Sequence, residues 1–526
     1  MKKKIIYLTI FLFMAKNDFF AQRVMSNTHY KYLVIKEVME NVAETFGSLS
    51  DTPQLIIMQG KSKIVAEYRV DPNPQLLFDE KLYNICTTFG EDSLDAIAFI
   101  VGHELTHYFY KHTDWANFGK DKRGDITNEN LKLIENQADL VGSFRAFSAG
   151  YNCFEIMKTL MERIYKEYKL PNELNGYFTK KERIINIESQ ADKAKRYSMA
   201  FEIANFLTLK LKYPQSTRIN KLIAVDLPTK EVLNNIGTNQ LLQAITFMNQ
   251  TEMPFRLPIE LEINNRLNPE QMRSEDEKLK MISLLNSAVI SFNEAIRIDE
   301  SYEIAYLNLA LAQILLEKYG SAQETIDELA KQGRLSVNGH LIRGIAAIMS
   351  QNIEEGESDF QKIKGAFEED FNRKVFINYQ ILIRNGDRKQ FLKSINMNVP
   401  KGETKLKEER NLFSYKIFSK SPIAQIFTGD YVIRTETNYS KYFMKFNILL
   451  SDTQYEVIKT NQNNVETELG VKINDKYPKV FNTYGEPTRK IAIHNGQILI
   501  YESASMLFQI EKNLVKYIYQ YSEKKR

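Results

Sequence analysis

Three of the six histidines of this chain lie within ten residues, and two of them flank a glutamate in the order H-E-x-x-H. The segment reads His103-Glu104-Leu105-Thr106-His107. On a helix, His103 and His107 project from one face, so both imidazoles can bind a single cation. Glu104 lies roughly 100° further around the helix axis, where its carboxylate misses the ion and reaches a water held by it. Imidazole and carboxylate ligands around an ion that keeps one position open are typical of catalytic zinc.

The third ligand decides the class of site. A metzincin would need glycine at position 110 and histidine at 113, but the chain has Tyr110 and Thr113 there. His112 is one residue out of that register, and we interpret it as structural. The remaining option is a carboxylate on a later helix.

Such a carboxylate is available in residues 131–142. Glu135 and Asp139 lie four residues apart, hence on one helix face, and the small Ala138 beside them permits close helix packing. Glu135 would complete the ligand set for one Zn²⁺ per chain. Asp139 would accept a hydrogen bond from the free ring nitrogen of a ligand histidine. The alternative is a solvated acidic pair on an amphipathic helix; the preceding H-E-x-x-H favours the ligand interpretation.

These residues need a framework of helices and short strands ahead of them. Periodicity predicts a helix at residues 34–46 and another at 81–88. Between them it predicts short strands at 54–58, 64–70 and 75–78. The main helix then runs from Gly90 to His112. Ala96, Phe99 and Ile100 share the histidine face one turn earlier, which gives the site an apolar floor.

The two motifs together resemble the gluzincin metallopeptidases related to the CaaX prenyl proteases. The resemblance extends to their soluble periplasmic branch, in which a tetratricopeptide domain follows the peptidase. The resemblance implies that His103, His107 and Glu135 are the zinc ligands. It also implies that Glu104 is the general base and that Asp139 is a hydrogen-bonding partner of a ligand.

A further family segment, ending in Arg-Ile, is similar to Lys180-Lys181-Glu182-Arg183-Ile184. The His-Pro that often precedes it is replaced by Gly176-Tyr177-Phe178. Catalysis also needs a hydrogen-bond donor for the oxyanion. Tyr177 and Arg183 are candidates, and Tyr108 and Tyr151 are available as well; the sequence does not choose among them.

Residues 196–372 repeat with a period of 34. Ala310 and Gly344, Ala322 and Gly356, and Ile326 and Phe360 are spaced in this way, which is the tetratricopeptide period. Weaker units are predicted at 198–228 and 231–250. The repeats predict an α-solenoid that binds a protein partner, while aromatic residues at these spacings, such as Tyr306 and Phe292, belong to its core.

After a linker at 373–420, residues 421–526 alternate apolar and polar residues in short runs. Strands are expected at 431–434, 442–446, 455–458, 489–493, 498–501, 506–510 and 515–519, with a helix at 470–484. We expect an antiparallel α+β domain with a docking role. The fold class is therefore α+β multidomain: a mainly helical zincin-like domain with a short sheet (22–195), an α-solenoid, and this C-terminal domain.

Residues 1–21 have the pattern of a secretory signal: Lys2 to Lys4, an apolar run from Ile5 to Ala15, and a possible cleavage site after Ala21. An uncleaved anchor is the alternative, although the apolar run is shorter than the ~20 residues that a spanning helix needs. Export places the chain in the periplasm or outside the cell, with at most peripheral membrane contact. Cys86 and Cys153 could form a disulfide or remain two buried thiols.

The formal charge of +4 falls to about +1 without the leader, since residues 1–21 carry four lysines and one aspartate. A nearly neutral chain lacks the basic surface that nucleic-acid binding requires. We therefore expect protein or peptide substrates and an exported zinc metalloendopeptidase, in which Glu104 is the general base on the zinc-held water. The rival hypothesis is a scaffold or chaperone that binds envelope proteins through its repeats and hydrolyses little or nothing.

Overall fold

A computed structural model describes residues 23–46, 52–60, 64–69, 73–112, 128–172, 178–248, 255, 257, 275–333, 335–363, 424–428, 431–435, 438–439, 443–463, 465–493 and 496–525. The chain divides into two compact units, Met1–Met199 and Ala200–Arg526. The division lies close to the predicted end of the peptidase domain at residue 195. The predicted signal (1–21) and linker (373–420) lie outside the described residues. Within the described parts, no helix combines the length and the apolar character needed to cross a membrane.

The first unit contains a four-stranded mixed sheet in the order β1-β2-β4-β3. The strands are β1 (Arg23–Val24), β2 (Gln54–Gln59), β3 (Ala66–Arg69) and β4 (Gln75–Asp79). β2 and β4 are parallel at the centre, and each edge strand is antiparallel to its neighbour. The three predicted strands are thus present, and β3 is an edge of the sheet.

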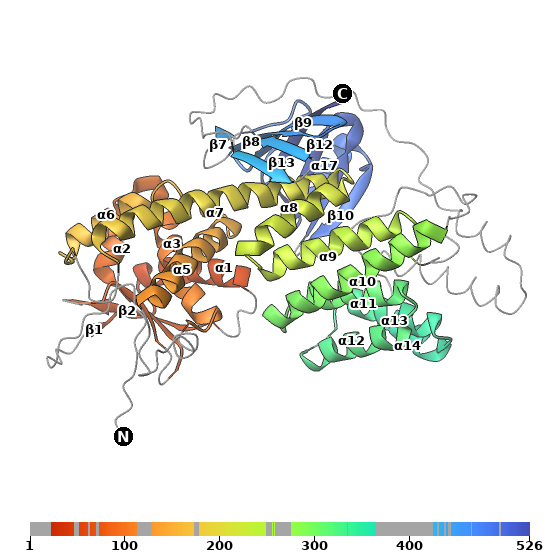
Figure 1. Cartoon of the computed structure of the whole chain (residues 1–526), viewed down its shortest axis with the longest axis horizontal. Helices are drawn as coiled ribbons and strands as arrows, with labels where there is room; N and C mark the ends of the chain where they lie inside the picture. The colour runs from red at the N-terminus through yellow and green to blue at the C-terminus, as the bar shows by residue number, and fades with distance from the viewer. Residues whose placement is uncertain are drawn as a thin grey trace, which may run out of the picture. The chain divides into compact units, whose positions relative to one another are not determined.

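The described helices of this part of the chain, labelled in Figure 1, are α1 (Tyr30–Phe46), α2 (Glu80–Thr87), α3 (Ser93–Phe109), α5 (Asn128–Ser148), α6 (Met157–Glu167) and α7 (Lys180–Leu209), whose end belongs to the second unit. α3 is the central one, because every residue from Asp95 to His107 is buried and the helix contacts α1, α2, α5, α6 and β3. A helix that is covered all round in this way is a core element.

The expectation that α3 extends to His112 was wrong. The helix ends at Phe109, and the chain leaves it through Lys111, which has a left-handed backbone with φ of 50°. This turn breaks the helical hydrogen bonding and returns His112 towards the helix that it has just left.

Two glycines set how closely α3 and α5 approach. A methyl group added at Gly102 would lie 2.5 Å from the carbonyl oxygen of Gly142, and one added at Gly142 would lie 2.6 Å from the backbone nitrogen of His103. The two backbones therefore touch at this point, which only glycine permits. Close contact of the helices brings side chains of α5 to the histidines of α3.

The helices of the second unit include α8 (Tyr213–Asp226), α9 (Lys230–Ile245), α10 (Glu275–Ile298), α11 (Glu303–Leu315), α12 (Tyr319–Lys331), α13 (Val337–Met349) and α14 (Ile353–Lys362). Successive helices pack as hairpins (Figure 1). α11 and α13 begin at Glu303 and Val337, so the predicted 34-residue period is confirmed. Tyr306 and Phe292 are buried, which confirms that they belong to the core.

The C-terminal part is a seven-stranded antiparallel sheet in the order β10-β11-β12-β13-β9-β8-β7. Its strands are β7 (Asn438–Tyr439), β8 (Phe443–Leu449), β9 (Thr453–Thr460), β10 (Arg489–Ile493), β11 (Gly496–Tyr501), β12 (Met506–Glu511) and β13 (Leu514–Lys525), with a separate hairpin of β5 (Ala424–Thr428) and β6 (Tyr431–Thr435). The predicted helix at 470–484 is shorter, since α17 spans only Tyr477–Tyr484.

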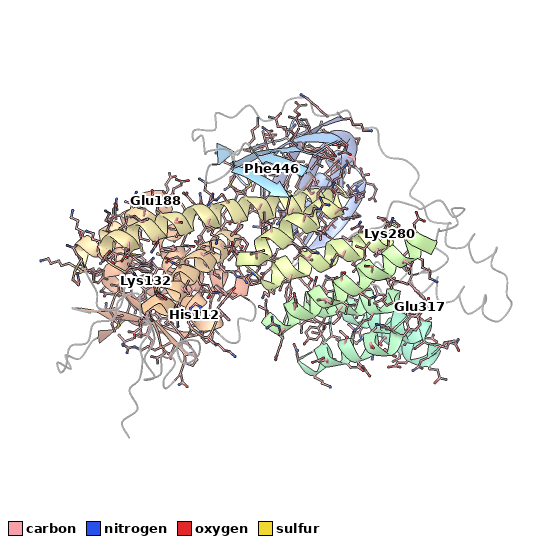
Figure 2. All side chains as sticks on the ribbon, viewed as in Figure 1. His112, Lys132, Glu188, Lys280, Glu317 and Phe446 are labelled. Atoms are coloured by element: carbon pink, nitrogen blue, oxygen red, sulfur yellow. The ribbon has the colours of Figure 1, made fainter. Side chains whose placement is uncertain are left out.

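The end of α7 and the C-terminal sheet are joined within the second unit. The Phe206 ring lies 5.8 Å from that of Phe446, which Figure 2 labels on the sheet. The half-buried Lys459 ammonium lies 2.7 Å from the carboxylate of Glu202, and Arg489 donates a hydrogen bond of 2.7 Å to the Leu209 carbonyl. An aromatic contact with polar contacts on either side fixes the sheet on this helix.

Candidate metal centre

The three predicted ligands meet at one point in the first unit. His103 Nε2 lies 3.1 Å from His107 Nε2 and 3.4 Å from Glu135 Oε2, and His107 Nε2 lies 3.6 Å from Glu135 Oε1. All three side chains are at most 1% exposed. In the described part of the chain this is the one cluster of histidine, cysteine and acidic side chains with the spacing of a metal site.

These distances fit a small tetrahedral cation. Ligand atoms bonded to zinc at ~2.0 Å in tetrahedral geometry lie about 3.3 Å from one another. The two histidine nitrogens are 3.1 Å apart, and each lies 3.4 or 3.6 Å from a different oxygen of the Glu135 carboxylate, close to that value. Two imidazole nitrogens and one carboxylate are also a donor set that zinc enzymes use. The residues therefore fit the ion that the sequence predicts.

The site attracts positive charge even as it stands. Burial lowers the pKa of His103, but hydrogen bonds to Asp139 and Glu135 outweigh it and raise that pKa to about 10. Burial and the neighbouring His103 hold the pKa of His107 well below its usual value. His103 therefore favours its charged form, at the position where a cation would compete for the same lone pair.

Glu104 lies beside the ligands with one oxygen held and one left over. Its Oε2 accepts a hydrogen bond of 3.0 Å from the backbone N–H of Tyr68 on β3. Its Oε1 is buried, and none of the described residues donates a hydrogen bond to it. Burial, opposed by His103 and reinforced by Glu135 and Glu67, raises the pKa of Glu104 to about 8. A buried carboxylate oxygen of this kind needs a donor such as water.

Asp139 makes the predicted contact with a ligand histidine. His103 Nδ1 donates to Asp139 Oδ1 at 2.9 Å, and Arg183 binds both carboxylate oxygens, with Nη2 at 2.9 Å from Oδ1. Asp139 is fully buried; burial raises its pKa, but the charge of Arg183 prevails and lowers it. The resulting anion fixes the His103 ring with Nε2 turned towards the other ligands.

The candidate oxyanion donors lie in different surroundings. Arg183 is 1% exposed and engaged with Asp139, so it supports a ligand rather than contacting substrate. Tyr151 accepts a hydrogen bond from Asn41, and the Tyr108 ring packs at 5.3 Å against Tyr68 on the edge strand. Tyr177 lies outside the described residues. Of the described candidates, Tyr108 is the nearest along the chain to the ligands.

Three features of the site were not predicted from the sequence. The Gly102–Gly142 crossing, the backbone contact of Tyr68 with Glu104, and the engagement of His112 with His107 all depend on tertiary packing. Glycines one residue from a ligand signal a close helix approach, but the partner helix is not readable from spacing. Cys86 and Cys153, whose pairing was left open, are both buried and unpaired.

Comparisons with known proteins assign no family. No protein-family model matches the chain, and no curated protein matches it. Among solved structures, the human IFIT1 dimer with m7Gppp-AAAA is 14% identical with a TM-score of 0.30, covering 60% of this chain and 61% of IFIT1. A tetratricopeptide repeat protein from Parabacteroides merdae is 16% identical with a TM-score of 0.19, covering 56% of this chain and 99% of that protein. The chain thus matches about 61% of the length of IFIT1, and superpositions at these TM-scores assign it neither a fold nor a ligand.

Proposed function

We propose that this protein is a zinc-dependent metalloendopeptidase of the cell envelope, of the gluzincin type related to the CaaX prenyl proteases. The observation that carries the proposal is the convergence of His103 Nε2, His107 Nε2 and the Glu135 carboxylate, whose two oxygens each lie within 3.6 Å of one histidine nitrogen, with Glu104 next to them. A structural zinc site needs four protein ligands, whereas three protein ligands beside a buried carboxylate favour catalysis.

The roles of the residues follow from their contacts. Zinc, when bound, would activate a water and polarise the carbonyl of the scissile peptide bond. His103, His107 and Glu135 would hold it. Glu104 would accept a proton at Oε1 and deliver it to the leaving amine, while the Tyr68 N–H holds its Oε2 in place. Because one carboxylate oxygen is held by this hydrogen bond, the carboxylate keeps its orientation while its other oxygen accepts and donates the proton.

The substrate class is an extended peptide. β3 is an edge strand with its Tyr68 N–H facing Glu104, so a peptide aligned along this edge would pass the base. Backbone hydrogen bonds to an edge strand recognise any extended segment, which favours an endopeptidase over an enzyme for one small substrate. The leader supports action on exported proteins.

The helical hairpins of the second unit would recruit substrate or a protein partner. Their 34-residue period supports tetratricopeptide repeats, which stack into a surface for protein binding.

The test combines metal analysis with hydrolysis of casein or a peptide library by the full chain, with and without chelator. Glu104→Gln should retain zinc and lose about 10²- to 10⁴-fold in rate, because the amide cannot accept the proton. Asp95→Asn is the matched control: Asp95 is a buried acid on the same helix, and it accepts a hydrogen bond from the backbone N–H of Asn152. It should keep hydrolysis within a few-fold.

The outcomes separate the peptidase from its rival. Full activity in Glu104→Gln would refute the assigned base. Stoichiometric zinc in the wild type without cleavage of any substrate would favour the alternative, a latent enzyme or a scaffold for envelope proteins.

A further inference from the structure

The two ligand histidines are supported from behind in different ways. His103 has the Asp139 carboxylate on its Nδ1, at 2.9 Å. His107 has a second imidazole there instead: its Nδ1 lies 2.8 Å from His112 Nδ1, and His112 Nε2 lies 3.1 Å from Gln137 Oε1. His103 is therefore supported by an anionic carboxylate, whereas His107 is supported by two neutral side chains in series, His112 and Gln137.

We propose that His112 is a positioning residue for the ligand His107. Its Nδ1 accepts the Nδ1–H of His107, and its own Nε2–H is held by the Gln137 oxygen. This fixes His107 in the tautomer whose Nε2 lone pair faces the cation site. The inference rests on the proposed metal centre and goes beyond it, because it assigns a function to a histidine outside the H-E-x-x-H motif.

The hydrogen positions follow from the contacts. A neutral imidazole has one donor and one acceptor nitrogen. If His107 Nε2 offers its lone pair to a cation, its Nδ1 carries the hydrogen and must meet an acceptor. His112 Nδ1 supplies that acceptor only when its own hydrogen is on Nε2, and Gln137 Oε1 is an acceptor at that end. Both hydrogen bonds therefore point the same way: His107 donates to His112, and His112 donates to Gln137.

The local fold explains how His112 reaches this position. α3 ends at Phe109, and the left-handed turn at Lys111 brings His112 back against the last turn of the helix. Its side chain is 1% exposed, and Figure 2 labels it in the body of the first unit. A histidine that remained on a continued helix, five residues after His107, would project from another face.

Five consecutive residues of α5, from Glu135 to Asp139, include the side chains that support both ligand histidines. Asp139 binds His103 directly, Gln137 reaches His107 through His112, and Glu135 is itself a ligand. Support by a neutral imidazole orients the ligand without adding charge. Its loss should therefore lower zinc affinity towards the small end of the ~10- to 100-fold range seen when hydrogen-bonding partners of ligands are removed.

The experiment measures zinc affinity of the full chain by competition with a chromophoric chelator. His112→Leu fills similar space but accepts no hydrogen bond, and we expect about a 10-fold weaker affinity. In His112→Asn the amide oxygen can occupy the place of Nδ1, so affinity should stay within about threefold of the wild type. His340→Leu, at a histidine of the second unit, is the control and should leave zinc affinity unchanged.

A second readout requires no metal. In metal-free protein labelled with ¹⁵N-histidine, the ring of His107 should be the Nδ1–H tautomer in the wild type and in His112→Asn, and a mixture in His112→Leu. Wild-type zinc affinity in His112→Leu, or equal weakening in the Leu and Asn variants, would overturn the positioning role and leave the peptidase proposal intact. If the wild type binds no zinc, the proposed function fails. The tautomer of His107 in the metal-free protein then decides by itself whether His112 positions that ring.

Discussion

Two helix pairs, α3/α5 in the first unit and α13/α14 in the second, are joined in the same way. Gly102 and Gly142 let the first pair touch backbone to backbone. In the second pair, a methyl group at Gly356 would lie 2.9 Å from the Gly344 carbonyl oxygen. In each pair the absence of a side chain lets the helices approach closely, and in each a buried aspartate lies in a cluster of polar side chains nearby.

That cluster has the same three members in both places: an aspartate bound by an arginine and by the Nδ1 of a histidine, namely Asp139, Arg183 and His103, and Asp359, Arg343 and His340. The imidazole-to-carboxylate distances are 2.9 and 3.0 Å, respectively. The two clusters thus share one set of hydrogen bonds, although Arg183 comes from a third helix, α7, and Arg343 comes from α13 itself.

The difference lies at the other nitrogen of the histidine. His103 Nε2 is buried and meets His107 and Glu135, whereas the His340 side chain is 19% exposed and belongs to no group with metal-site spacing among the described residues. An aspartate that is bound by an arginine contacts the Nδ1 of the imidazole in both places. What makes one of them a candidate for chemistry is the arrival of two further ligands.

The largest contrast should come from replacing the two aspartates. Asp139→Asn turns an amide towards Arg183 and His103, leaves a buried guanidinium without its anion, and should cost about 3–5 kcal/mol of stability. Zinc affinity should fall about 10- to 100-fold. Asp359→Asn faces Arg343, which is 17% exposed and also binds Asp327, so it should cost about 1–3 kcal/mol and leave zinc affinity unchanged.

Chemical denaturation of each unit and chelator competition measure both effects in the full chain. Equal loss of zinc affinity in the two variants would show that the comparison is wrong and that both changes act through general destabilisation.

A smaller contrast should come from the glycines. Gly344→Ala would bring a methyl group to 2.7 Å from the Phe360 ring, a side chain that can shift, and should cost about 1–3 kcal/mol. Gly142→Ala meets the backbone of Gly102 and His103, which cannot shift without moving a ligand. It should cost at least as much and also weaken zinc binding, which Gly344→Ala should not.

Thermal unfolding with and without added zinc tests this pair. A zinc-induced stabilisation of Gly142→Ala as large as that of the wild type would show that the crossing does not set the ligand spacing.

The smallest contrast is a pH dependence confined to the second unit. Burial raises the pKa of Asp359, but Arg343, His340 and Lys362 outweigh it and lower that pKa below the usual 3.8. A carboxyl whose pKa is depressed in the folded state stabilises above its unfolded pKa, and the effect is lost as pH falls through the folded value. The difference between wild type and Asp359→Asn should therefore be fully present above the usual pKa of 3.8 and should shrink as the pH falls below it.

Hydrogen exchange of amides in α13 and α14, compared between the two proteins at each pH, checks this prediction. A difference that persisted or grew in acid would contradict the assigned ion pair.

The sequence predicts which side chains come together, because their spacing carries the information. Two histidines four apart and two acids four apart specify faces of helices, and local geometry then brings the pairs into register. The partner of each face is not specified by spacing. Gly102 and Gly142, which bring α3 to α5, and the turn at Lys111, which redirects His112, act through contacts between segments far apart in the chain.

The same distinction holds for the fold. Alternating strands such as β9 and β12 and the 34-residue helical period are local patterns, and the structure reproduces them. The helix expected at 470–484 begins only at Tyr477, because Asn474 has a left-handed backbone with φ of 67° and the chain before it is held by turns. Val471 and Ile473, the apolar residues of the segment before Tyr477, are buried without being helical.

The most direct test of the metal centre is the number of zinc ions bound per chain in wild type, His103→Ala and His340→Ala. The two histidines share an aspartate–arginine support, and only His103 has further ligands at Nε2. We predict one zinc per chain in the wild type and in His340→Ala, and none in His103→Ala. A wild type without zinc, or a His103→Ala chain that binds as much as the wild type, would contradict the assignment.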